Sequence, residues 1–154
     1  MRILTLAGLT LLASCAAGPQ NQRATLYVSM SGLQEVPGPG DPDGNGTVEV
    51  NATPSQGQVC WDIYARQIDA ATAAHIHRGA EGVAGPVVLM LTTPDAAGHS
   101  QGCATVDQAL AREIAYQGHA FYVNVHNAAF PAGAIRGQLR GGPLNRDPPP
   151  GVTR

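Results

Sequence analysis

The stretch QVCWDIYA, residues 58–65, indicates how this chain folds, because apolar and polar side chains alternate along it. Successive side chains of a β-strand point to opposite faces of the sheet, so the alternation is typical of a strand with one buried face. The apolar face carries Val59, Trp61, Ile63 and Ala65, and the other carries Cys60, Asp62 and Tyr64. We therefore expect Trp61 to lie in the core.

Runs of the same kind extend along the chain on both sides of this stretch. They are TLYVSM at 25–30, GTVEVNA at 46–52, AFYVNVH at 120–126 and AIRGQLR at 134–140. Clusters of Gly, Pro, Asn and Asp separate them, and ATPSQGQ at 52–58 has the composition of a hairpin loop. Many short alternating strands between turn clusters predict an all-β sandwich or barrel.

Two segments depart from the alternation. The run PVVLML at 86–91 is continuously apolar, which predicts a strand buried on both faces. The run at 107–118, DQALAREIAYQG, begins with Asp107 as a good N-cap, spaces its apolar residues as a helix does, and ends at Gly118. We therefore expect one short helix near 107–117 on the β fold.

The N-terminus has the pattern of an export signal. An apolar run at 3–12 follows Arg2 and is too short to span a bilayer as a stable helix. The motif LASC at 12–15 resembles the lipobox of bacterial lipoproteins, which implies cleavage before Cys15 and acylation of that cysteine. The alternative is an ordinary secretory signal cleaved near 16–17, which would discard Cys15.

These observations divide the chain into four parts. We expect a lipoprotein signal peptide at 1–14, a tether at 15–23, a folded domain at 24–140 and a disordered Pro/Gly-rich tail at 141–154. The protein would then be exported and anchored to a membrane by lipid on Cys15. Because Ala rather than Asp follows the cysteine, the periplasmic face of the outer membrane or the cell surface is favoured.

The charge of the chain argues against two classes of partner. Nine basic and eleven acidic residues give a formal net charge of −2, and no lysine occurs. Charged residues make up 13% of the chain, against about 25% in a typical domain. Such a surface lacks the basic patch that binds nucleic acid or anionic lipid, so we expect neither partner.

The cysteines agree with export. With Cys15 lipidated, Cys60 and Cys103 remain, which is an even number in an oxidising compartment. We predict that they form a disulfide. Two buried thiols or a soft-metal site is the alternative, although neither cysteine has the CxxC spacing of such sites.

The segment AAHIHRGAEGVAGP at 73–86 places two histidines one residue apart. On a strand, His75 and His77 would share one face about 6.6 Å apart, with Ile76 directed into the core. His126 ends the later run at 120–126, on the polar face of that strand. If the two strands are neighbours, three imidazoles meet outside the barrel, and three neutral imidazoles suit copper, zinc or nickel.

Three longer stretches carry a family resemblance. LQEVPGPG with GTVEV, CWDIYARQIDAATAAHIHRGAEGVAGPVV, and YVNVHNAAFPAGAIRGQL together resemble the CHRD domain, named after the repeats of chordin, over about 25–139. The resemblance implies an immunoglobulin-like Greek-key β-barrel, loosely similar to copper-zinc superoxide dismutase. There an HxH pair and a later V-H supply copper ligands, and by motif these match His75, His77 and His126. Copper is therefore favoured over zinc.

The likeness to the dismutases stops at those ligands. Their sites also need a bridging histidine and zinc ligands that include an aspartate, whereas only His99 and His119 remain here, in no matching motif. No nucleophile–base pair or phosphate-binding loop is recognisable either. Dismutase activity is unsupported, and we expect a binding protein rather than an enzyme.

Three further residues lie in the motifs, and each has two interpretations. Glu35 would bring a carboxylate near the histidines, or its neighbour Pro37 only directs the chain out of a strand. Asn124 would orient the ring of His126, or it bonds across the sheet. Arg136 would form an ion pair or anchor a loop, which explains it as well as catalysis does.

Two functions from different classes follow. In the first, the protein is a lipoprotein that binds copper at the cell envelope for sequestration or transfer. In the second, it is a metal-free adhesion or interaction module with a protein partner, in which the histidines hydrogen-bond the loop at 78–86. Substitution of His75, His77 and His126 separates them, because only the first predicts that each abolishes metal uptake while the fold survives.

Overall fold

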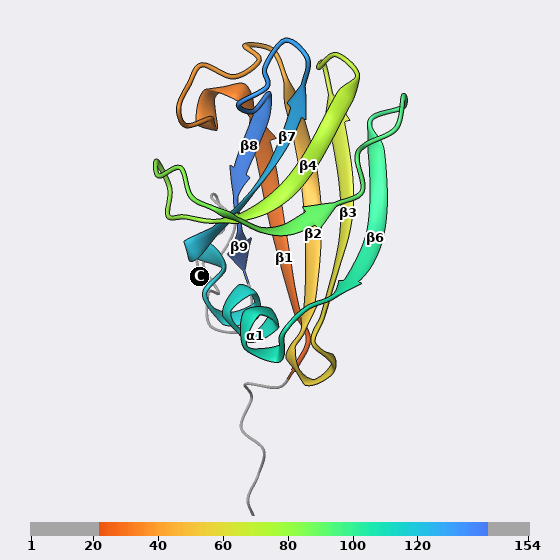
Figure 1. Ribbon diagram of the computed structural model, residues 1–154, viewed down its shortest axis with the longest axis vertical. Coiled ribbons are helices and arrows are strands. Elements are labelled where there is room, and N and C mark those ends of the chain that lie inside the picture. The colour runs from red at the N-terminus through yellow and green to blue at the C-terminus, as the bar shows by residue number, and fades with distance from the viewer. Residues whose placement is uncertain (1–21, 142–154) are drawn as a thin grey trace, which may run out of the picture.

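The computed structural model describes residues 22–141 and shows an all-β fold with one short α-helix, as the alternating pattern predicts (Figure 1). The strands are β1 (Ala24–Ser31), β2 (Asn45–Thr53), β3 (Gln58–Arg66), β4 (Ala71–Arg78), β5 (Val87–Leu91), β6 (His99–Thr105), β7 (Phe121–Asn127), β8 (Ile135–Gln138) and β9 (Arg140–Gly141). The helix α1 spans Gln108–Tyr116, and short 3-10 turns occur at Gly32–Gln34, Pro54–Gln56 and Gly118–Ala120.

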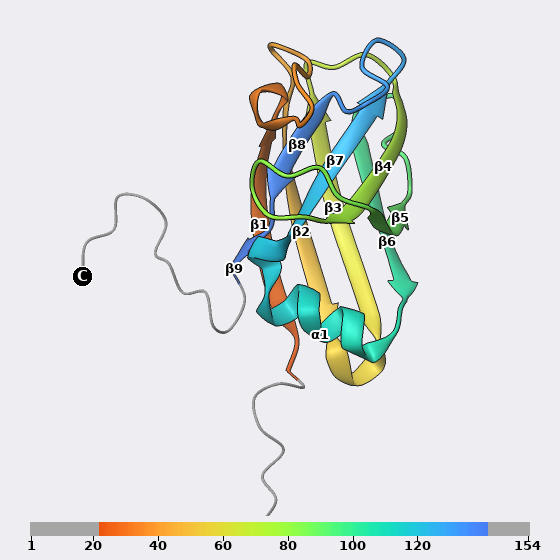
Figure 2. The same cartoon turned by 60° about the vertical axis from the view of Figure 1, so that its left-hand side comes forward.

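The strands form one sheet that curls into a nearly closed barrel. Their order is β5-β4-β7-β8-β1-β2-β3-β6, and β9 pairs with β1 off this path. Strands β4, β7 and β8 cross in front of β1, β2, β3 and β6, and Figure 2 shows the same two layers from the side. Strand β4 carries the HxH pair and β7 carries the V-H. The two strands pair directly, as the hypothesis of a shared histidine site required.

The core lies between the two layers and is filled by the alternating apolar positions. Trp61 is 7% exposed, and its indole N–H donates to the hydroxyl of Ser100 at 3.2 Å, which satisfies the one polar atom of the ring. The same core contains fully buried aliphatic side chains from both layers, among them Leu26, Val50, Ile63, Ile76, Val123 and Ile135. The pattern at 58–65 is confirmed along the whole of β3.

The helix α1 covers one end of the barrel, beside β9 (Figure 2). The carboxylate of Asp107 accepts a hydrogen bond from the backbone N–H of Ala109 at 2.7 Å, which caps the first turn. Ala111, Ile114 and Ala115 are buried against the strands. The predicted helix is confirmed, with bounds that differ from the prediction by one residue at each end.

The predicted disulfide is confirmed. Cys60 on β3 and Cys103 on β6 are directly paired across the two strands and are bonded, closing a loop with a sequence separation of 43. In the chain-entropy account such a loop contributes about 4 kcal/mol to stability. The bond fastens β6, the last strand of the path, to the rest of the sheet.

The segment 86–91 differs from its prediction. It forms β5, but this strand is at the other end of the path and pairs only with β4, and Val87 and Met90 are 44% and 64% exposed. Of its five residues only Leu91 is buried. An edge strand has one face on the core and the other toward solvent, and a run of apolar residues does not reveal this.

The predicted terminal segments mostly lie outside the described residues. The signal peptide at 1–14 and Cys15 fall wholly outside them, as does most of the tether at 15–23 and of the tail at 141–154. Strand β9 extends to Gly141, the first residue assigned to the tail. Within residues 22–141, no helix has the length and apolar character needed to cross a membrane.

Candidate metal centre

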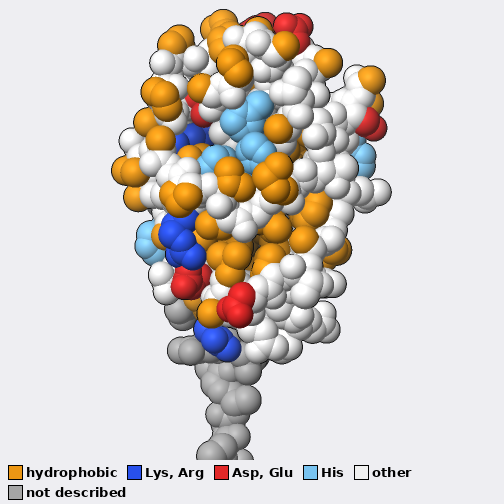
Figure 3. All heavy atoms as spheres, in the orientation of Figure 1, with side chains coloured by type: hydrophobic (Ala, Val, Ile, Leu, Met, Phe, Trp, Pro, Cys, Tyr) orange, Lys and Arg blue, Asp and Glu red, His pale blue; other side chains and the backbone are white. Residues whose placement is uncertain are grey.

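The histidines at 75, 77 and 126, hereafter the histidine cluster, come together on the outer face of β4 and β7. His75 is paired with Asn124 across the strands, and His126 is paired with Ala73, so His75 and His126 are diagonal neighbours. Ala73 is small, which leaves space for the ring of His126 to lean toward His75, and the two ring centroids lie 4.9 Å apart. Figure 3 shows histidine side chains gathered on this face with hydrophobic side chains beside them.

The nitrogen atoms of the histidine cluster are close enough to share one ion. One nitrogen from each ring lies within 4.8 Å of the others. Nδ1 of His75 is 3.1 Å from Nε2 of His126. Since metal–imidazole bonds are about 2.0–2.1 Å long, two ligands of one ion are separated by about 3 Å, which this distance matches.

Backbone carbonyls determine which nitrogen of two rings carries the lone pair. Nδ1–H of His77 donates to the carbonyl of Gly85 at 2.8 Å, and Nδ1–H of His126 donates to the carbonyl of Pro131 at 3.0 Å. In the neutral rings the lone pair is then on Nε2. Nε2 of His77 is buried and has no hydrogen-bond partner, which is costly for a polar atom unless something binds there.

Burial keeps two members of the cluster uncharged. It lowers the pKa of His75, and positive charge on His126 and on His77 would lower that pKa further. Burial likewise lowers the pKa of His126, although the hydrogen bond to Pro131 opposes the change. Both rings are therefore neutral near pH 7, the form in which imidazole binds metals.

The ring of His77 is also held by stacking. It lies parallel to the ring of Tyr122, with centroids 4.7 Å apart and 8° between the planes. The guanidinium of Arg136 lies over the ring of Tyr122, and its central carbon is 3.5 Å from the ring centroid. The backbone N–H of Gly85 donates to the hydroxyl of Tyr122 at 3.1 Å, so the same tyrosine contacts both the ring and the loop that orients it.

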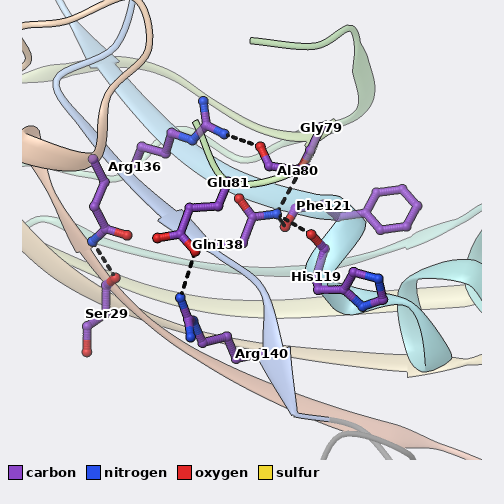
Figure 4. Close-up of polar contacts among 10 residues, drawn as sticks. Ser29, Gly79, Ala80, Glu81, His119, Phe121, Arg136, Gln138 and Arg140 are labelled. Atoms are coloured by element: carbon purple, nitrogen blue, oxygen red, sulfur yellow. Dashed lines mark hydrogen bonds and ion pairs between the residues drawn. The ribbon is translucent and has the colours of Figure 1, made fainter. Parts of the chain in front are cut away.

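Arg136 anchors the loop that carries Gly85. Its guanidinium donates to the carbonyls of Ala80 and Val83 at 3.1 and 3.0 Å, and Figure 4 shows the first of these bonds. The residue is 2% exposed, and it forms no ion pair with any carboxylate within residues 22–141. At Gly85 a side chain is excluded, because a Cβ would collide with the carbonyl oxygen of Arg78.

The family model of the CHRD domain matches residues 26–139, a range that contains the histidine cluster and the residues that contact it. The chain belongs to the CHRD domain family. No curated protein and no solved structure matches it, so the family assignment rests on the domain model alone.

In this CHRD domain, Gln138 supports the other side of the loop. Its side-chain amide donates to the carbonyls of Gly79, His119 and Phe121 at 2.9, 2.8 and 2.7 Å (Figure 4). The I-R-G-Q motif therefore supplies two buried side chains from β8 that hold the segment following the HxH pair. The motif contains Gln138, but sequence reasoning singled out only Arg136.

Glu35 reaches the histidine cluster through Asn124. It is 6% exposed, and its carboxyl is hydrogen-bonded to Asn124, whose side-chain amide lies 3.1 Å from Nε2 of His126. Burial raises the pKa of Glu35 to about 7, against the opposing effects of the Arg136 charge and of the hydrogen bonds from Val36 and Asn124. Gly133 gives the carboxyl its space, since a Cβ there would collide with it.

The other two histidines lie apart from the cluster. His99 is on β6 and pairs with Asp62 at 2.9 Å, and its ring stacks on Tyr64 with centroids 4.6 Å apart. His119 lies in the 3-10 turn before β7. Tyr122 and Gly85 are the contributors that the sequence hypothesis missed, although the outward position of Tyr122, two residues before Asn124, was readable from the alternation.

Proposed function

We propose that this protein is an envelope-anchored CHRD-domain lipoprotein that binds a metal ion through His75, His77 and His126. The observation that carries the proposal is Nε2 of His77, which is buried, lacks a partner and belongs to a ring whose other nitrogen is held by Gly85. One nitrogen from each of the three rings lies within 4.8 Å of the others, so the cluster can supply three ligands to one ion. The fourth position stays open to water or another ligand.

Copper is the ion we favour, with zinc as the second choice. Neutral imidazoles bind both, but copper heads the affinity order of the divalent first-row metals. The motif likeness to the copper ligands of the dismutases points the same way. Sequestration or transfer of the ion fits these residues better than catalysis, because the matching motifs include no bridging histidine or zinc ligands.

The anchor is proposed from the sequence at 12–15, with lipid on Cys15. Such a protein would be held at the periplasmic face of the outer membrane or at the cell surface. Expression with labelled fatty acid tests this directly. Label is expected in the wild-type protein and absent from Cys15→Ser, whereas an unlabelled, released wild type would contradict anchoring and favour an ordinary secretory signal.

A metal-free interaction module is the second candidate, and one observation favours it. His77 and His126 already donate to loop carbonyls, as histidines that only fasten loops would do. On this proposal the cluster stabilises the loops, and a protein partner binds the surface they form. The unpartnered Nε2 of His77 is what this candidate leaves unexplained.

Titration with Cu(II) and Zn(II) by calorimetry separates the two candidates. We expect one ion per chain, and loss of that binding in His77→Ala and in His126→Ala. His99→Ala is the matched control, because it removes a half-exposed histidine from the opposite layer. Equal uptake by all four proteins, or none by the wild type, would contradict the metal site. Circular dichroism shows that each variant is folded.

A further inference from the structure

Strand β5 places one more side chain beside the histidine cluster. Met90 is directly paired with His75 across β4 and β5, so their side chains leave the sheet on the same face. The Cβ atoms of such a pair lie about 4.5–5.5 Å apart, within reach of a long flexible side chain. Hydrophobic side chains do lie immediately beside the histidines in Figure 3.

The exposure of Met90 is not explained by packing. It is 64% exposed, whereas Met30, the other methionine within the described residues, is 2% exposed in the core. Its neighbours Leu89 and Leu91 belong to the core or pack against it, so β5 is held in place without Met90. A large apolar side chain on the outer face of an edge strand contributes little to folding.

The strand geometry keeps Met90 aligned with the cluster. The pairing of β4 with β5 is regular from Ala74 to Ile76 and then shifts, so that His77 is opposite Val87 and Val88 is an extra residue. The bulge therefore lies on the Val87 side and leaves the His75–Met90 pair in register. Bulges of this kind often occur beside functional sites, where they redirect side chains.

We propose that Met90 supplies its thioether sulfur as a fourth ligand to the ion held by the histidine cluster, and that it makes the site retain Cu(I) as well as Cu(II). This inference rests on the proposed function. A thioether is a soft ligand that selects Cu(I), while imidazole binds both oxidation states. Three histidines leave the fourth position open, and the flexible chain of methionine adapts to it.

The full chain and its Met90→Leu variant test the inference, because leucine keeps the apolar bulk and removes the sulfur. Cu(I) affinity is measured without oxygen by competition with bicinchoninate, and Cu(II) affinity by calorimetry. We expect Met90→Leu to weaken Cu(I) binding roughly tenfold or more and Cu(II) binding less than about threefold. Met30→Leu, which removes the buried methionine, leaves both affinities unchanged.

A second variant and a second readout keep the result unambiguous. Met90→His replaces sulfur with nitrogen, so the affinity ratio of Cu(I) to Cu(II) falls further in it than in Met90→Leu. X-ray absorption of the Cu(I) form shows a sulfur ligand in the wild type and in Met30→Leu, and none in Met90→Leu.

Two results would overturn the inference in different ways. If wild type and Met90→Leu bind Cu(I) equally and neither shows a sulfur ligand, Met90 is not a ligand. The three-histidine proposal then still stands. A wild type that binds neither oxidation state would overturn both proposals.

Discussion

His99 and the histidine cluster present the same side chain in two surroundings. His99, on β6, has a carboxylate partner in Asp62 at 2.9 Å and a stacked ring in Tyr64. The cluster, on β4 and β7, has no acidic side chain in hydrogen-bond contact among the described residues. Backbone carbonyls accept the Nδ1–H of His77 and of His126 instead. A carboxylate and a carbonyl each accept one ring N–H, and each leaves the lone pair of a neutral imidazole on its other nitrogen. The two surroundings differ in convergence: among the described residues, only the cluster brings one ligand nitrogen from each of three histidines within 4.8 Å of the others.

The largest effect we expect separates stability from binding. Cys60→Ser combined with Cys103→Ser should lower the free energy of unfolding by about 3–4 kcal/mol, because the unfolded chain regains the freedom that the disulfide removes. The metal affinity of the histidine cluster should not change, since the bond lies on the β3–β6 side. Denaturant unfolding and metal titration of the same samples check both statements. A parallel loss of metal affinity would show that the two sides are not independent.

Substitution of Arg136 should have a somewhat smaller effect on stability, but it should lower the metal affinity as well. Arg136→Ala removes the donors to Ala80 and Val83 and the contact with Tyr122, at a cost of about 3 kcal/mol in the free energy of unfolding. The freed loop no longer holds Gly85 against His77, so metal binding should weaken roughly tenfold or more.

Arg136→Lys is the matched variant for this prediction. It keeps the charge but not the planar fork that contacts two carbonyls, and it should fall between wild type and Arg136→Ala in both measurements. Unchanged metal binding in Arg136→Ala, with a folded protein, would show that the loop does not orient His77.

The third prediction concerns pH. The folded protein holds a proton on Glu35 up to a pKa of about 7, against 4.5 in the unfolded chain, so wild-type stability falls as pH rises from about 4.5 through 7. The side chain at this position in the Glu35→Gln variant does not ionise. Its free energy of unfolding relative to wild type should therefore rise by about 1–2 kcal/mol between pH 5 and pH 8, allowing for solvent screening. A pH-independent difference would contradict the raised pKa.

The smallest effect is on the other histidine. His99→Ala removes a partly exposed hydrogen bond to Asp62 and should change the free energy of unfolding by less than about 1 kcal/mol. It should leave metal binding unchanged. Thermal unfolding and calorimetry measure the two quantities, and weakened metal binding would mean that His99 takes part in the site.

Local patterns in the sequence predicted much of this architecture. The alternation around Trp61 predicted its strand and its burial, and Asp107 with the helical spacing after it predicted α1. The HxH spacing places His75 and His77 on one face for a geometric reason, the two-residue period of a strand. These features depend on neighbours within a few residues, which a sequence displays directly.

What the sequence did not reveal depends on contacts between distant segments. The exposure of Met90 follows from the position of β5 at an edge, and no local pattern encodes strand order. The link from Glu35 through Asn124 to His126 joins two distant segments, and the stack of Arg136, Tyr122 and His77 joins three. The burial that orients these polar groups arises only when both layers are assembled.

The most direct test of the central claim is a crystal structure of the protein grown with copper, with anomalous scattering recorded at the copper edge. We expect one strong peak bounded by His75, His77 and His126, and none beside His99. A peak at His99 and Asp62, or no peak on the face of β4 and β7, would contradict it.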